Sequence, residues 1–200
     1  MSNTTYIDSS TSSGYISLGK QILHILNEHF SYDQTLVILC IGTDRATGDC
    51  LGPLVGEQLK SRLHFSKDHL SCIVFGNLET PVHAVNLEET IEHIYKNFDN
   101  PYIIAIDASL GTTSHIGYAT VSPNAILPGK GVQKKLPAIG DLSITGIVNL
   151  SGFAGSALLQ STRLFTVMQL SKMISNGICY ALRNYTAEAY AKTSYLDSPL

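Results

Sequence analysis

The stretch TLVILCIGTDRATGDCLGPLVGEQLKSRL (35–63) decides the fold, because a Gly-rich turn joins an apolar run to a helical pattern in it. The continuous run QTLVILCIG (34–42) is typical of a strand covered on both faces. Proline favours the first helical position, so Pro53 predicts a helix over 53–64 with Gly52 as its cap. The turn also carries two aspartates, Asp44 and Asp49, at the point where the strand passes the chain to the helix.

The same alternation of strand and helix patterns continues on both sides of this stretch. Strands predicted to alternate with helices imply a mostly parallel sheet with helices on both faces, which is a three-layer α/β/α sandwich. We expect a disordered tail over 1–14, a single α/β domain over 15–190 and a polar tail over 191–200. Within the domain we expect helices over 17–30, 53–64, 86–98 and 161–186 and strands over 34–42, 71–77, 101–109, 116–123 and 142–152.

Composition excludes several classes of protein. The net charge is −3 and the basic residues do not cluster beyond QKK (133–135), which argues against binding to nucleic acid or to an anionic membrane. The apolar runs are too short to cross a bilayer and the N-terminus lacks an apolar signal segment, so we expect a cytoplasmic protein. The four cysteines are scattered without a C-x-x-C pair, which indicates neither a zinc site nor a disulfide scaffold.

Two aspartates follow the ends of predicted strands. Asp107 ends the strand YIIAID (102–107), and Asp49 lies in the loop after LVILCIG (36–42). Ligands of open α/β sheets bind beyond the carboxyl ends of the strands, so both side chains belong to one edge and meet if the strands are neighbours. Two adjacent carboxylates can divide the work of a general acid and a general base, which suits amide hydrolysis. The alternatives are a helix cap for Asp49 and a strand-end turn for Asp107.

Three motifs together resemble the YyaC type of sporulation protein of spore-forming bacteria. They are GTDRATGDCLGPLVG (42–56), IIAIDASLG (103–111) and PGKGVQKKLPAIGDLSITGIVN (128–149). More distantly, they are similar to the germination protease, the endopeptidase that degrades small acid-soluble spore proteins. That family is classed as an atypical aspartic peptidase, with one aspartate in the D-x-L-G-P turn and one at the I-A-I-D strand end. The matching positions in this chain are Asp49 and Asp107.

This resemblance implies a fold, a reaction and a partner. The fold is the three-layer sandwich shared with hydrogenase-maturation peptidases, and the implied activity is a peptidase in which the aspartate dyad activates a water. The implied partner is a protein or peptide substrate, such as a small acid-soluble spore protein inside the sporulating cell or the spore. No cofactor is implied by the dyad. Hydrogenase-maturation peptidases hold nickel through a Glu, an Asp and a His, and this chain has Asp49 at the Glu position.

Other residues extend the candidate site. Asp44, Asn77, Glu79 and Lys130 are candidate substrate contacts, with simple solvation or local capping as the alternative for each. If a divalent metal is bound, Asp49 and Asp107 would be ligands together with His115, and His83 is the other histidine near enough in sequence. Cys50 has no implied histidine base and is expected to pack inward. Two other functions stay open, a peptide-binding or regulatory protein without turnover and a metal-dependent hydrolase.

Overall fold

The computed structural model describes residues 4–63, 72–128, 138–152 and 155–196, and over 189–196 the description covers the backbone alone. The elements are β1 (Thr5–Asp8), α1 (Gly14–His29), β2 (Thr35–Cys40), η1 (Gly48–Cys50), α2 (Leu51–Leu63), β3 (Cys72–Phe75), α3 (Leu87–Asn97), β4 (Pro101–Gly111), η2 (Thr113–His115), β5 (Tyr118–Ser122), β6 (Leu142–Leu150), α4 (Gly155–Gln160) and α5 (Leu164–Leu196). Strands and α-helices alternate from α1 to β4, as the sequence predicts.

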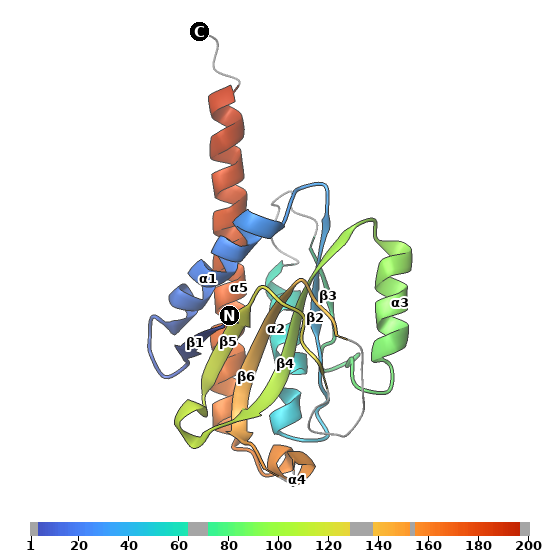
Figure 1. The fold of residues 1–200 in the computed structure, drawn as a ribbon, viewed down its shortest axis with the longest axis vertical. Coiled ribbons are helices and arrows are strands. Elements are labelled where there is room, and N and C mark those ends of the chain that lie inside the picture. The colour runs from blue at the N-terminus through green and yellow to red at the C-terminus, as the bar shows by residue number, and fades with distance from the viewer. Residues whose placement is uncertain (1–3, 64–71, 129–137, 153–154, 197–200) are drawn as a thin grey trace.

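One six-stranded sheet forms the middle layer, in the order β1-β5-β6-β4-β2-β3 (Figure 1). β3, β2, β4 and β6 run parallel to one another, whereas β5 runs antiparallel to β6 and β1 antiparallel to β5. The predicted three-layer α/β/α fold is therefore confirmed. The antiparallel part corresponds to the change of rhythm after residue 110, because β5 returns from β4 without an intervening α-helix.

Two apolar clusters cover the two faces of the sheet, as expected for strands buried on both sides. Leu36, Ile38 and Ile104 belong to the larger cluster, which also contains apolar residues of α1, α2 and α5. Val37 and Ile103 point to the other face and pack with Leu87 and Ile94 of α3. Figure 1 shows α3 on the opposite side of the sheet from α1 and α5.

Three boundaries differ from those predicted. α2 begins at Leu51 rather than at residue 53. Proline is tolerated as the third helical residue, because the first four N–H groups of a helix have no partner within it and the missing N–H of Pro53 costs no hydrogen bond. The predicted disordered tail contains β1, whose single buried apolar residue, Ile7, is too little for a periodic pattern. The last helix is longer than predicted, since α5 continues to Leu196 through the segment expected to be a tail. Among the helices of the described residues, none combines the length and apolar character needed to cross a membrane.

Candidate active site at the carboxyl edge of the sheet

β2 and β4 are neighbours, so the loops that follow them share one edge of the sheet. The Ile41 N–H donates to the carbonyl of Ile106 at 2.7 Å, which fixes the end of β2 directly beside Asp107. On the other side, Ile41 forms a parallel bridge with Val82, and the Gly42 N–H donates to the Val82 carbonyl at 2.7 Å. Three segments distant in sequence therefore meet at the end of β2.

Asp49 is held against the loop that precedes it. Both its carbonyl and its carboxylate Oδ2 lie 3.1 Å from the N–H of Thr43, which donates to them. The carboxylate thus accepts from a loop N–H rather than from an N–H of the following helix, which is not the geometry of a helix cap. Gly42 makes this approach possible, because a Cβ there would lie 2.0 Å from the Asp49 carbonyl oxygen.

Asp107 lies within β4. Its neighbour Ile106 points into the larger apolar cluster, so Asp107 points to the opposite face of the sheet, the face that α3 covers further along the strand. Its Oδ1 accepts a hydrogen bond from the Ala108 N–H at 2.8 Å. Burial, and then the negative charge of Asp49, raise the pKa of Asp107 well above its ordinary value. The Ala108 hydrogen bond lowers this pKa and offsets part of the increase.

His83 is the third ionisable group of this edge. It follows Val82, which is tied to Ile41 and Gly42, so its backbone stands beside the loop that holds Asp49. The Val85 N–H donates to His83 Nδ1 at 3.3 Å.

The two carboxyl groups differ in what offsets their burial. Burial raises the pKa of Asp49 too, but the Thr43 hydrogen bond and the charge of His83 both lower it. For Asp107, no cationic group of the described residues lowers the pKa, and the charge of Asp49 raises it further. The surroundings therefore favour the proton on Asp107 and the charge on Asp49, which is the division that acid–base catalysis by two carboxyls requires.

Hydroxyl groups continue the site along the same face of the sheet. Thr145 of β6 is in register with Asp107 on one side and with Thr120 of β5 on the other. The Thr145 hydroxyl lies 2.7 Å from the Thr120 hydroxyl, and Ser109 donates to it at 3.3 Å. These residues were not among the predicted site residues. The alternation of polar and apolar residues in LSIT (142–145) was the available signal.

The predicted substrate contacts have different surroundings. Asp44 and Glu79 are exposed, and Lys130 lies outside the described residues. Asn77 is buried, and its Oδ1 accepts from both the N–H and the hydroxyl of Thr80, so the side chain closes its own turn. Burial and the charges of Asp44 and Asp49 raise the pKa of Cys50, which disfavours a nucleophilic thiolate.

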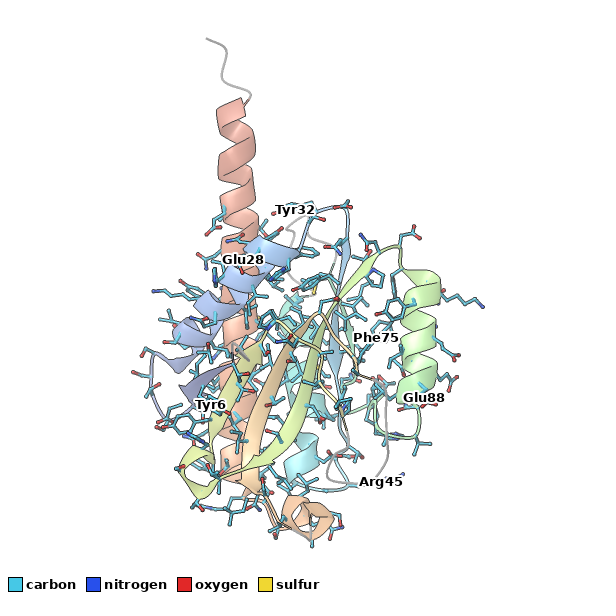
Figure 2. All side chains as sticks on the ribbon, viewed as in Figure 1. Tyr6, Glu28, Tyr32, Arg45, Phe75 and Glu88 are labelled. Atoms are coloured by element: carbon cyan, nitrogen blue, oxygen red, sulfur yellow. The ribbon has the colours of Figure 1, made fainter. Side chains whose placement is uncertain are left out.

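His115, the histidine predicted for a metal site, lies elsewhere on the sheet. Its ring centroid is 4.9 Å from that of Tyr6 in β1 and 5.4 Å from that of Tyr118 in β5. Figure 2 shows Tyr6 on the left of the molecule, Phe75 and Glu88 on the right, and Arg45 of the Asp49 loop near the lower end. Within the described part of the chain, no group of three or more His, Cys, Asp or Glu side chains is arranged to hold a metal ion.

Comparison with known proteins gives two matches. The model of a family described as "Protein of unknown function (DUF1256)" matches residues 10–177. The "Uncharacterized protein YyaC" of Bacillus subtilis (strain 168) is 45% identical over 161 residues, which cover 80% of this chain and 76% of that protein. The predicted likeness to YyaC is confirmed, and the family match spans all the elements that form the edge with Asp49 and Asp107.

Proposed function

The chain belongs to the DUF1256 family, and we propose that it is a sporulation-associated peptidase in which Asp49 and Asp107 act as a carboxylate dyad. One observation supports this proposal: two partly buried carboxyl groups lie at the carboxyl edge of neighbouring parallel strands, and the charge of Asp49 raises the pKa of Asp107. Their positions are also those at which the sequence resembles the germination protease, which supports peptide hydrolysis over other acid–base reactions.

The proposed reaction uses one water and no covalent enzyme intermediate. Ionised Asp49 takes a proton from the water as its oxygen attacks the peptide carbonyl, and protonated Asp107 donates its proton as the C–N bond breaks. The products are a carboxylic acid and an amine, and proton exchange with solvent returns the pair to its starting state. The Thr145 hydroxyl accepts a hydrogen bond from Ser109 and, next to Asp107, can donate its own proton to a carbonyl of a bound chain.

The proposed substrate is an extended or unfolded protein segment, such as a small acid-soluble spore protein, inside the sporulating cell or the spore. An extended segment suits this edge because the row of Ser109, Thr145 and Thr120 hydroxyls crosses three strands on one face. Hydroxyls bind backbone groups of any sequence, so the row fits a polypeptide rather than one small molecule.

Cleavage of an unfolded small acid-soluble spore protein tests this proposal. The wild type, Asp49→Asn and Asp107→Asn are each assayed with and without a metal chelator, and Asp44→Asn is the control for loss of a carboxylate on the same loop. We expect cleavage by the wild type and Asp44→Asn alone, with no effect of chelator. Cleavage that survives both other substitutions would refute the dyad, and activity lost with chelator would indicate a metal-dependent hydrolase.

A further inference from the structure

A groove of about 550 Å³ lies between the end of β3 and α3. This volume is within the range of small-ligand sites, roughly 300–1,000 Å³. Its wall comes from three segments: Phe75 at the end of β3, residues 80–83 of the following loop, and the first two turns of α3. Figure 2 shows Phe75 next to α3 and Glu88 at the beginning of that helix.

The groove is built before any ligand binds, because one side chain links two of its segments. Asn86 donates from Nδ2 to the Pro81 carbonyl at 3.1 Å, and its Oδ1 accepts from the His83 N–H at 2.8 Å. The Phe75 ring meets the His93 ring edge-on, with centroids 5.9 Å apart. A preformed wall of this kind spares a ligand the entropic cost of ordering the loop.

Among the described residues, the lining combines apolar surface with one carboxylate. Phe75, Pro81 and Val82 supply the apolar part, Glu89 supplies the carboxylate, and none of the described lysines or arginines lines the groove. The neighbouring residues add Glu79 and Glu88, both exposed. A side chain with an apolar stem and a cationic head matches this lining, with the stem against Phe75 and Pro81 and the head toward Glu89.

His83 connects the groove to the aspartate pair. It lines the groove, and it is also the neighbour whose charge acts on Asp49. The carbonyl of the preceding residue, Val82, accepts a hydrogen bond from the Gly42 N–H. The next N–H along the chain, that of Thr43, donates to the Asp49 carboxylate. A chain bound across the pair at one end can therefore place a nearby side chain in the groove.

We propose that this groove is the subsite that selects the substrate of the proposed peptidase, and that it accepts an arginine or lysine side chain close to the scissile bond. The role as a substrate subsite rests on the proposed function, whereas the chemistry of the bound side chain follows from the lining of the groove. Glu89 is the specificity-determining residue, with Phe75 and Pro81 as the surface for the methylene stem.

The test uses two fluorescent decapeptides of alanine, glycine and serine, which carry at the centre either arginine or its uncharged isostere citrulline. Binding is measured by fluorescence anisotropy at low ionic strength with the full-length Asp107→Asn protein, which is expected to bind without turnover. We expect a preference of about threefold to fivefold for arginine, as is typical of one exposed charge pair. Glu89→Gln should abolish it, and Glu88→Gln should preserve it.

Glu88→Gln is a matched control, because both glutamates lie in the first turn of α3 and both are exposed, but only Glu89 lines the groove. Equal binding of the two peptides, no binding of either, or equal effects of the two substitutions would overturn the assignment. Cleavage by the wild type separates the two proposals. Equal cleavage of both peptides keeps the peptidase and overturns the subsite, whereas arginine-selective binding without cleavage keeps the groove and overturns the peptidase.

Discussion

Replacing Gly42 with alanine tests how closely the Asp49 loop is packed. Gly42 has φ +143°, a conformation that L side chains rarely adopt, and an added Cβ would lie 2.0 Å from the Asp49 carbonyl oxygen. Real Cβ atoms essentially never approach closer than 3.0 Å, so the two segments must separate by about 1 Å. That movement pulls Asp49 away from the Thr43 N–H that holds its carboxylate.

The expected cost has two parts. The positive φ costs about 1–2 kcal/mol for a residue with a side chain, and the weakened Thr43 hydrogen bonds cost about 0.5–1.5 kcal/mol more. We therefore expect Gly42→Ala to lower the free energy of unfolding by about 1.5–3.5 kcal/mol. Because a misplacement of about 1 Å can cost on the order of 100-fold in rate, peptidase activity should fall by a comparable factor.

Gly117→Ala is the matched control. Gly117 also has a positive φ, +88°, but the nearest atom to an added Cβ is the Ser9 hydroxyl at 3.7 Å, an ordinary contact. It should therefore cost only the strain of about 1–2 kcal/mol and leave activity unchanged. Urea unfolding followed by circular dichroism measures both variants, and equal destabilisation would refute the close packing of Asp49 against Gly42.

Three further predictions concern buried or charged groups. Asp107→Asn should stabilise the fold near pH 7, because the unfolded wild type ionises from about pH 3.8 whereas the raised pKa delays ionisation of the folded state to higher pH. A stability gain that persists unchanged below pH 3.8 would contradict this. Tyr102→Phe should raise the free energy of unfolding by about 1 kcal/mol, because the buried Tyr102 hydroxyl has no hydrogen-bond partner among the described residues. Urea unfolding measures this change, and a decrease of similar size would show that the hydroxyl has a partner. His83→Gln should move the acidic limb of the pH profile of kcat/KM to higher pH, because the charge of His83 lowers the pKa of Asp49. A similar shift in the control His93→Gln would argue against a specific effect of His83.

The sequence predicts the sheet and the aspartate edge well, because both depend on local patterns. Buried parallel strands appear as unbroken apolar runs, and a polar residue after such a run belongs to the carboxyl edge. β2 and β4 are indeed adjacent, which brings the loop with Asp49 to the side of Asp107. The YyaC likeness followed from the same residues.

Contacts that depend on pairing between distant segments were harder to predict. His83 was weighed only as a metal ligand, and its place near Asp49 depends on the bridge between Val82 and Ile41. The position of Thr145 likewise depends on β6 lying between β4 and β5. β1 was missed because a four-residue strand with one buried side chain gains its stability from β5, not from its own pattern.

The proposed function requires that Asp49 and Asp107 form one electrostatically coupled pair, and NMR titration of their carboxyl carbons measures this coupling. We expect Asp107 to hold its proton well above pH 3.8 in the wild type. In Asp49→Asn, the pKa of Asp107 should fall, because a like charge is removed, yet stay above the ordinary value, because burial remains. An Asp107 that titrates normally, or whose titration is unchanged by Asp49→Asn, would show that the two carboxyl groups are not coupled.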